Sequence, residues 1–559
     1  MLLKGFILKY HRLLFYSIWF VLHCIQAFNT ELFDDEAYYW VYSKFPAWGY
    51  FDHPPVIAIL IKAGYAIFHN ELGVRILTII LSTASLWIIE SLLERKNVFL
   101  FYAICGSMAL AQIGGMLAVP DAPLMFFIAL FFYLYKRFVS DMSLLNTLLI
   151  GLVIALMFYT KYHAVLIVLL TGLSNLKLFR HWQTYAACVF ALLLFMPHLY
   201  WQHINGYPSL QFHLFERNAG EFTIWYVLEF IGGQILLAGP VMGWLLLIAA
   251  FSYRPTSLNE RALKFTLVGI YIFFFLASLR GKTEANWTIP SYIGLIVLSH
   301  QYLLTSARFR KMLYVALPFT FLLVCTGRII MMTDLPPAWW IFKDEFHENK
   351  NFVKQVKSRA KDKPAVFLDT YQKPSKYWFY SGDSAFALNT TTYRRNNYNF
   401  WPIEENYIGR AAYVFGQYDR YFFNDGFVLR NGDRNGGRLI RDYYSFSKLR
   451  IDGIEVNQLD SNNVSVSFTT NTPDEYLNYF REFPYDTASV YLAVYRKNKL
   501  IKYINSNMTV KNIQQAQQQN NVSFELKVPN DDYEYKLAIS TCLPGHLSLN
   551  SSGFKLTVN

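Results

Sequence analysis

The first 330 or so residues alternate between long apolar runs and short polar breaks, and the rest of the chain is polar. A helix rises 1.5 Å per residue, so roughly 20 apolar residues cross a hydrocarbon core of about 30 Å. We therefore expect a mainly α, polytopic membrane domain over residues 1–335, with about 11–13 transmembrane helices. Eleven predicted spans lie near residues 13–29, 74–93, 98–118, 123–137, 146–160, 164–176, 184–200, 227–250, 264–279, 288–303 and 312–330. The apolar run Val56–Phe68 is too short to span, so we expect it at the interface or as a re-entrant piece.

The polar remainder of the chain predicts two soluble domains. Over residues 336–442, short apolar stretches such as Ala365–Leu368 and Ala412–Phe415 alternate with helix-like segments, which predicts an α/β domain. Over residues 443–559, short β-type runs are separated by Asn, Asp and Gly, which predicts a β-rich, sandwich-like domain.

The composition agrees with a membrane protein and explains the positive charge. The chain is 54% hydrophobic and 16% charged, against about 25% charged in soluble domains. Its net charge of +12 does not call for nucleic acid, because many basic residues lie in alternate loops between the apolar runs. The positive-inside rule then predicts a cytoplasmic N-terminus. With an odd number of spans, everything after residue 335 lies outside.

The first predicted outer loop carries two acidic motifs, FDDEAYYW at 33–40 and GYFDHPP at 49–55. Carboxylates beside lipid are costly unless a metal, a cation or a substrate requires them. Asp35, Glu36 and Asp52 are therefore candidates for chemistry. Acids that cap a helix in a solvated loop, and a simple turn at the paired prolines, are the alternative interpretations.

Two further motifs place charges at the outer ends of predicted helices. Asp121, in VPDAPLMFF at 119–127, has no neutralising neighbour in sequence, and a functional carboxylate and a helix cap are equally good interpretations. The motif TKYHA at 160–164 places Lys161 and His163 at the end of another helix. Snorkelling of the lysine toward water is the alternative there.

Two other outer loops add basic residues. The loop 197–221 holds three histidines, His198, His203 and His213, together with Arg217, in a spacing that matches no metal signature. A divalent metal on Asp52, His203 and His213 is the one cofactor considered. The motif LRGKTEANWTIP at 279–290 supplies Arg280, Lys282 and Glu284. The guanidinium and ammonium groups suit a lipid phosphate, and isolated boundary charges are the alternative interpretation.

These acids and bases converge on one predicted face of the membrane, at the depth of a lipid headgroup. A carboxylate that activates an acceptor hydroxyl and cations that hold a leaving phosphate are the parts needed for glycosyl transfer from a lipid phosphate.

The motifs DDEAYYW, GYFDHPP, PDAPLMFF, TKYHA, YWQHINGYPSLQFHLFERN, FIGGQILLAGP and KTEANWTIPSY, in this order, carry a resemblance to a known family. They resemble the bacterial branch of the protein O-mannosyltransferase-like enzymes, which are GT-C membrane glycosyltransferases of family 39. The relatives that transfer aminoarabinose to lipid A share the plan. The resemblance covers residues 10–420, and its specificity lies in the order and spacing of the motifs.

Carried over residue by residue, the resemblance implies Asp35 as the general base for the acceptor hydroxyl, next to Glu36. It implies Asp52 and Asp121 at the other acidic positions of the family. The implied contacts to substrate or carrier phosphate are His53, Lys161, His163, Arg217, Lys282 and Glu284. His53 stands where the aminoarabinose relatives have lysine, which is a departure from the family's pattern.

The resemblance implies an inverting transfer of sugar from a polyprenyl-phosphate carrier on the periplasmic face of the bacterial inner membrane. A glycan, a lipid or a protein is the implied acceptor. A flippase or transporter of lipid-linked sugars and a membrane-anchored binding protein are the competing hypotheses. The donor sugar, the carrier and the acceptor stay open at this point.

Overall fold

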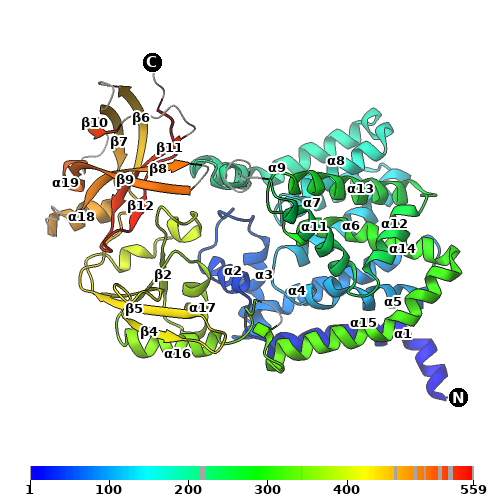
Figure 1. Cartoon of the computed structure of the whole chain (residues 1–559). Helices are drawn as coiled ribbons and strands as arrows, with labels where there is room; N and C mark the ends of the chain where they lie inside the picture. The colour runs from blue at the N-terminus through cyan, green and yellow to red at the C-terminus, as the bar shows by residue number, and fades with distance from the viewer. Residues whose placement is uncertain are drawn as a thin grey trace. The chain divides into compact units, whose positions relative to one another are not determined.

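The structure is a computed structural model that describes all of the chain except residues 1, 214–221, 341–342, 459–462, 483–487, 497–498, 514–518, 527–532 and 557–559. The chain divides into a helical unit, Met1–His347, and a strand-rich unit, Glu348–Asn559. In Figure 1 the helical unit runs from blue to green, and the strands of the other unit run from yellow-green to red. The further boundary at residue 442 stays a prediction.

The helical unit consists of helices joined by short connections. They are α1 (Leu2–Asn29), α2 (Asp34–Lys44), α3 (Val56–Tyr65), α4 (Glu71–Leu92), α5 (Val98–Ser107), η1 (Leu110–Gly114), α6 (Asp121–Ser140), α7 (Leu144–Phe158), α8 (Ala164–Ser174), η2 (Leu176–Arg180), α9 (Trp182–Ile204), α10 (Pro208–Gln211), α11 (Ile224–Ala238), α12 (Gly243–Ser252), α13 (Leu258–Ser278), η4 (Ala285–Ser291), α14 (Tyr292–Thr305), α15 (Ala307–Thr333) and η5 (Ala338–Trp340).

Several of these helices begin at a capping side chain. Asn70, Asn97 and Ser257 each accept a hydrogen bond from the backbone N–H three residues later, at 3.1–3.2 Å. Such a cap satisfies one of the first N–H groups of a helix, which have no partner within it. The sequence thus fixes where α4, α5 and α13 start.

In the described chain, five helices are long and apolar enough to cross a membrane, namely α4, α6, α9, α13 and α15. The number is seven if the bent pairs α1–α2 (87°) and α11–α12 (93°) each make one span. The protein is therefore a multi-pass membrane protein, as predicted.

All eleven predicted runs fall on helices of the described chain, but several are not single long helices. The run 227–250 is broken between α11 and α12, and 98–118 contains both α5 and η1. Because apolar residues continue across these breaks, the sequence predicts one continuous span for each run. α3 has 10 residues and is as short as expected.

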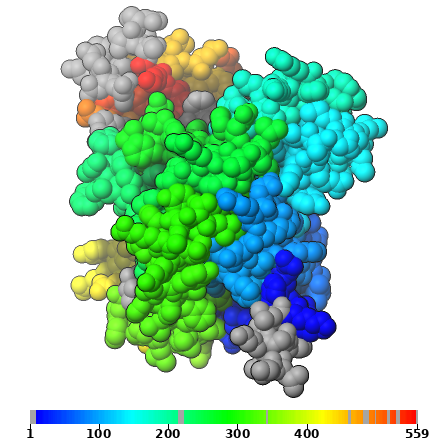
Figure 2. All heavy atoms as spheres, turned by 90° about the vertical axis from the view of Figure 1, so that its right-hand side faces the viewer, coloured from blue at the N-terminus to red at the C-terminus, as the bar shows by residue number. Residues whose placement is uncertain are grey.

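The outer surface of the helical unit is apolar. Leu193 on α9 is 63% exposed and Phe319 on α15 is 64% exposed. Side chains of this kind on a spanning helix face lipid tails instead of water. α14 contacts α4 and α5, and α15 contacts α5, so late green helices lie beside early blue ones on the face drawn in Figure 2.

The strand-rich unit begins with a mixed five-stranded sheet in the order β2-β1-β3-β5-β4. β1 pairs in parallel with both β2 and β3, whereas β5 is antiparallel to β3 and β4. The helices of this part are α16 (Asn349–Ala360) and α17 (Gln372–Ser381), and α17 connects β1 to β2. The strands are β1 (Ala365–Leu368), β2 (Ala385–Leu388), β3 (Ala412–Gln417), β4 (Asp425–Val428) and β5 (Arg434–Ile440).

Two antiparallel sheets follow, in the orders β10-β7-β6 and β12-β11-β8-β9. Val466 and Phe524 of the first sheet and Leu492 and Leu537 of the second belong to one buried apolar cluster, which is the packing of a β-sandwich. The α/β and β-rich characters predicted for the soluble region are confirmed. The strands are β6 (Arg450–Gln458), β7 (Asn463–Asn471), β8 (Ser489–Arg496), β9 (Lys499–Thr509), β10 (Gln519–Glu525), β11 (Tyr533–Ser540) and β12 (Leu547–Leu549), with α18 (Asp474–Glu482) and α19 (Val510–Ile513) between them.

Candidate functional site

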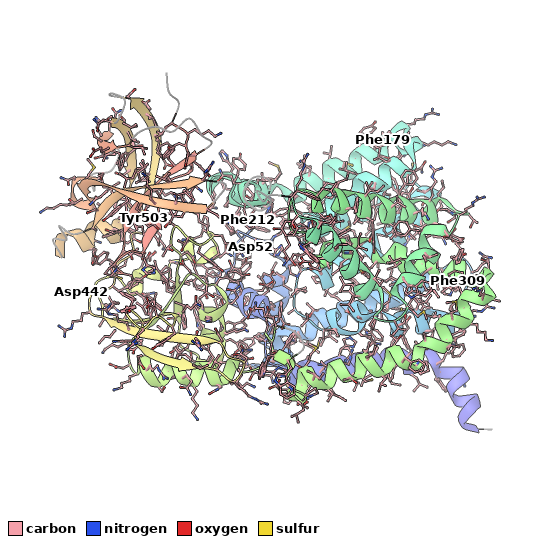
Figure 3. The ribbon with its side chains drawn as sticks, viewed as in Figure 1. Asp52, Phe179, Phe212, Phe309, Asp442 and Tyr503 are labelled. Atoms are coloured by element: carbon pink, nitrogen blue, oxygen red, sulfur yellow. The ribbon has the colours of Figure 1, made fainter. Side chains whose placement is uncertain are left out.

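The second acidic motif and two basic segments predicted to face the cytoplasm, 177–180 and 308–311, lie at opposite ends of the helical unit. Figure 3 shows Asp52 beside Phe212 at one end, whereas Phe179 of η2 and Phe309 of α15 lie toward the other. Phe179 and Phe309 lie within the basic loops 177–180 and 308–311. The separation of the two charge types predicted from the sequence is therefore present in the fold.

Glu36 is completely buried and is held by four donors. Arg75 Nε and Nη2 donate to its two oxygens at 2.8 and 2.6 Å. The backbone N–H groups of Phe33 and Ala118 donate at 3.0 and 2.7 Å. Both oxygens are thus occupied, and the carboxylate joins the start of α2 to α4 and to the loop before α6.

Arg75 is equally buried and extends this connection. Its Nη1 donates to Ala27 O and Thr30 O at 2.9 and 2.7 Å, and its Nη2 donates to Glu31 O at 2.9 Å. A guanidinium group with five donors suits such a cluster of acceptors. The pair therefore fixes the backbone that leads into α2, and with it the position of Asp35.

Asp35 lies half-buried in the first turn of α2, beside Asp34. Acids at this place stabilise a helix N-terminus, which is the structural alternative raised by the sequence. Lys343 lies close enough to feel their charge. Its pKa is raised first by its hydrogen bond to Glu345 and further by the charges of Glu345, Asp34 and Asp35, although burial opposes the shift.

Asp52 is 8% exposed and is approached by two tyrosines of α2. The hydroxyls of Tyr38 and Tyr42 donate to its Oδ2 at 3.2 and 3.4 Å. These tyrosines are four residues apart, so they lie on one face of the helix. The second acidic motif is therefore packed against the first.

Asp121 and Lys161 form a buried ion pair of 2.7 Å, with side chains 8% and 6% exposed. Asn286 Nδ2 donates to the other oxygen of Asp121 at 3.3 Å. Asp121 also begins α6. The carboxylate is thus neutralised by a residue distant in sequence, and three motifs meet at one point.

Hydrogen bonds join two further motifs to this point. Val56 N donates to Tyr159 O at 3.2 Å, which places the GYFDHPP loop next to TKYHA. Gln234, of the motif FIGGQILLAGP, donates to Ala285 O at 3.0 Å. The convergence of the motifs at one place is therefore a property of the fold.

The other residues predicted to contact the substrate or the carrier phosphate lie in different environments. His53 packs edge-on against Tyr39, and His163 packs edge-on against Phe274. Lys282 and Glu284 form an exposed pair at 3.4 Å, with side chains 58% and 48% exposed. Arg217 lies outside the described residues.

Among the described residues, Asp52, His203 and His213 do not together meet the geometric criteria for a metal site. His213 Nε2 lies 3.1 Å from the main-chain oxygen of Asp52, and His203 Nδ1 lies 3.0 Å from the Tyr207 hydroxyl. His198 bridges Trp48 O and the Tyr162 hydroxyl. Within the described residues, the geometric criteria for a metal site are met elsewhere, by Asp334, Asp344 and His347.

Three participants in this site were missed from the sequence, namely Arg75, Asn286 and Tyr38. Arg75 had a usable signal, because a charge inside the predicted span 74–93 is expensive unless it has a partner. Asn286 lies within a motif that drew attention only to its charged residues. Tyr38 is one of several aromatic residues in its motif, and nothing in the sequence distinguishes it.

Comparison with known proteins shows which families and structures this chain resembles. Residues 52–201 match the family described as dolichyl-phosphate-mannose-protein mannosyltransferase. The lipid A galacturonosyltransferase RgtD of Rhizobium johnstonii is 25% identical over 285 residues. The match spans 48% of this chain and 60% of that relative, which is less than two thirds of its length.

Two structures of ArnT from Cupriavidus metallidurans share the fold at 12% identity. The apo structure has a TM-score of 0.55 and covers 78% of this chain and 98% of its own. The structure bound to undecaprenyl phosphate has a TM-score of 0.54 and covers 76% and 97%. The GT-C fold predicted from the sequence is thereby confirmed.

Proposed function

We propose, on the premise that this chain is a GT-C membrane protein related to the lipid A-modifying glycosyltransferases, that it transfers a sugar from a polyprenyl-phosphate carrier to an acceptor hydroxyl. The observation that carries the proposal is the meeting of six motifs around Asp121, Lys161 and the start of α2. Lipid-phosphate donors are amphipathic, so such a site belongs at the membrane boundary. The positive-inside rule places this end of the protein on the periplasmic side.

Asp35 is the proposed general base. Glu36 and Asp121 are buried and form ion pairs with Arg75 and Lys161. A carboxylate must approach the acceptor hydroxyl to take its proton as the bond to the sugar forms. The half-buried position of Asp35 on a firmly held helix end meets that need better than the buried acids do.

The proposed reaction is a single displacement with inversion. The acceptor oxygen attacks the anomeric carbon, the bond from that carbon to the phosphate oxygen breaks, and Asp35 receives the hydroxyl proton. Cations then stabilise the leaving phosphate. Lys161 is the buried candidate for this role, because Asp121 takes one donor of an ammonium group that has three. Lys282 and Arg217 are proposed as further phosphate contacts.

The names of the relatives suggest which donors to test first. RgtD is named for galacturonosyl transfer to lipid A, and one ArnT structure holds undecaprenyl phosphate. We therefore propose an undecaprenyl-type carrier and a glycolipid acceptor for this chain, with uronic acid, aminoarabinose and neutral hexose as the donor sugars to compare.

The test is a transfer assay on purified protein in detergent, with labelled sugar on undecaprenyl phosphate and a membrane extract as acceptor. Asp35→Asn is expected to lower the transfer rate by about 10²–10⁴-fold, the usual contribution of a general base. The matched control is Asp34→Asn, which removes a neighbouring half-buried acid from the same helix turn.

Equal rates for Asp35→Asn and the wild type, at equal melting temperature, would remove the base assignment. Anomeric analysis of the product tests inversion separately, since a retained configuration contradicts a single displacement. Sugar that crosses vesicle membranes without forming a new bond would instead identify a flippase.

A further inference from the structure

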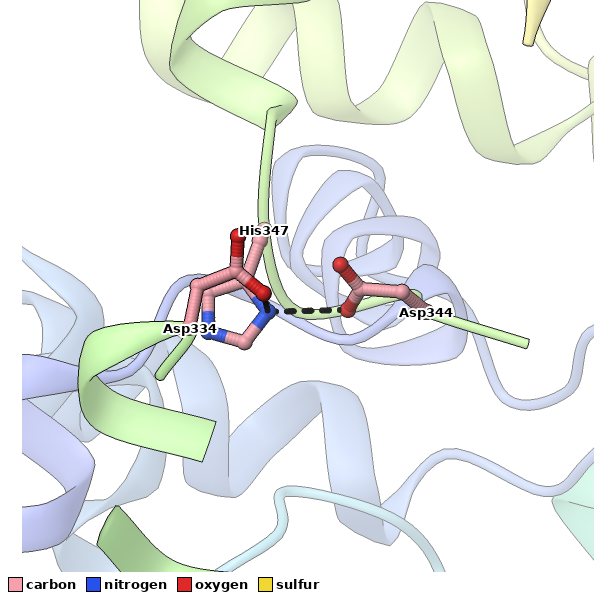
Figure 4. Close-up of side chains that lie close together, drawn as sticks. All are labelled: Asp334, Asp344 and His347. Carbon is pink, nitrogen blue, oxygen red and sulfur yellow. Dashed lines mark hydrogen bonds and ion pairs between the residues drawn. The ribbon is translucent and has the colours of Figure 1, made fainter. Parts of the chain in front are cut away.

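A second group of ligand-type side chains lies at the end of α15. Asp334, Asp344 and His347 each offer one ligand atom, and these atoms lie within 4.8 Å of one another. His347 Nδ1 is 2.9 Å from Asp344 Oδ1 and 3.8 Å from Asp334 Oδ1. Figure 4 shows the two carboxylates beside the imidazole ring.

We propose that these three residues bind one divalent transition-metal ion, for which zinc is the best match. Zinc takes carboxylate oxygen and imidazole nitrogen at about 2.0–2.2 Å, so neighbouring ligand atoms lie about 3–4 Å apart around it. The measured separations are of this size. The ion would sit between side chains that already face one another.

A buried atom without a partner points to a missing ligand. The Asp344 side chain is 1% exposed, and its Oδ2 has no hydrogen-bond partner in the described part of the chain. A buried acceptor left without a partner costs free energy, and native proteins rarely tolerate it. A metal ion bound by the Asp344 carboxylate would satisfy it.

The backbone holds the two carboxylates in place. Asp334 Oδ1 accepts from Ala338 N at 2.8 Å, and Asp344 Oδ1 accepts from Phe346 N at 3.0 Å. Hydrogen bonds of this kind orient metal ligands before the ion arrives. The site is therefore built by local chain geometry and is more than a cluster of acids.

The chemistry of the three ligand side chains indicates which metal ion the site would bind. An imidazole with carboxylates suits zinc and its neighbours in the first transition series, whereas calcium and magnesium prefer oxygen donors throughout. Three protein ligands leave positions open for water or a further ligand.

The proposed ion would connect α15 to the segment that covers the first acidic loop. Phe346, next to His347, stacks on Phe33 with ring centroids 5.5 Å apart. Phe33 directly precedes α2. Metal binding would thus order the chain beside the start of α2, although the inference itself does not depend on the transfer reaction.

The test measures zinc bound to the purified full-length protein after treatment with a chelator and dialysis against zinc. We expect about one zinc per chain for the wild type, and at least tenfold weaker binding for Asp344→Asn and for His347→Gln. Glu345→Gln is the matched control, because it changes a carboxylate in the same segment that is not one of the three ligands.

Melting temperature and gel filtration identify a variant that fails to fold, and the other variant then decides. Asp52→Asn and His213→Gln test the alternative metal set, and both are expected to keep the zinc. Equal zinc in wild type, Asp344→Asn and His347→Gln would overturn the proposal. So would a wild type that binds no zinc, or loss of zinc in Asp52→Asn alone.

Discussion

Glu36 and Arg75 illustrate, at the scale of single residues, how an acid expected to be catalytic serves the structure. Both side chains are fully buried, and their pairing is bidentate. Removing one partner of a buried pair leaves the other charge unpaired, which typically costs about 3–5 kcal/mol. Arg75→Met is therefore expected to lower the melting temperature strongly and to reduce the yield of folded protein.

The control for this prediction is Lys136→Met, in the exposed pair Lys136–Glu94, where a surface ion pair is worth about 0–1 kcal/mol. The double variant Arg75→Met/Glu36→Leu separates the two possible causes. If the unpaired charge is the cause, the double variant recovers much of the stability lost in the single one. A single variant as stable as Lys136→Met would contradict the structural role of the pair.

Residue types were easier to predict than residue partners. The acids at 35, 36, 52 and 121 stand out because each lies beside apolar sequence. Their partners do not, since Arg75 is 39 residues from Glu36 and Lys161 is 40 residues from Asp121. A pairing over that distance depends on which helices pack together, and a single sequence does not contain that information.

At the scale of elements, the sharp bend between α11 and α12 depends on a close approach of the backbone. A Cβ added at Gly243 would lie 1.9 Å from the main-chain oxygen of Ile235, so the backbone would have to move. Gly243→Ala is expected to destabilise the protein by about 1–3 kcal/mol, as overpacking commonly does. The displacement would also reach Gln234 and its bond to Ala285, so we expect slower transfer.

Gly232→Ala, on α11 before the bend, provides the matched comparison. A Cβ there meets nothing within 4 Å, and alanine is the better helix former by about 1 kcal/mol. This variant is expected to melt at or above the temperature of the wild type. Equal melting temperatures for Gly243→Ala and Gly232→Ala would show that the bend does not require glycine.

Helices were predicted better than their breaks. The apolar run 227–250 contains Gly239, Pro240 and Gly243, which in a soluble protein would suggest a turn. Glycine and proline are common within membrane spans, so these residues alone do not predict that a span is interrupted. α11 packs against η4, and that contact is not visible in the sequence.

For the molecule as a whole, hydropathy and turn patterns were sufficient for a membrane part, a mixed α/β sheet and a β-sandwich-like end. They were sufficient because alternation and run length depend only on local sequence. The orientation of the chain rests on charge alone, and it determines which side of the membrane holds the acidic site.

The positive-inside rule predicts that the basic loops 177–180 and 308–311 face the cytoplasm, opposite to Asp52 in the helical unit. Alkaline phosphatase, which is active only after export, is therefore expected to be inactive when fused at residue 180 or 310 and active after Asn559. A fluorescent protein that matures only in the cytoplasm should give the reverse pattern. Because an odd number of spans is required to move the C-terminus outside, a cytoplasmic C-terminal reporter would contradict the predicted topology. The periplasmic assignment of the strand-rich unit would then be wrong.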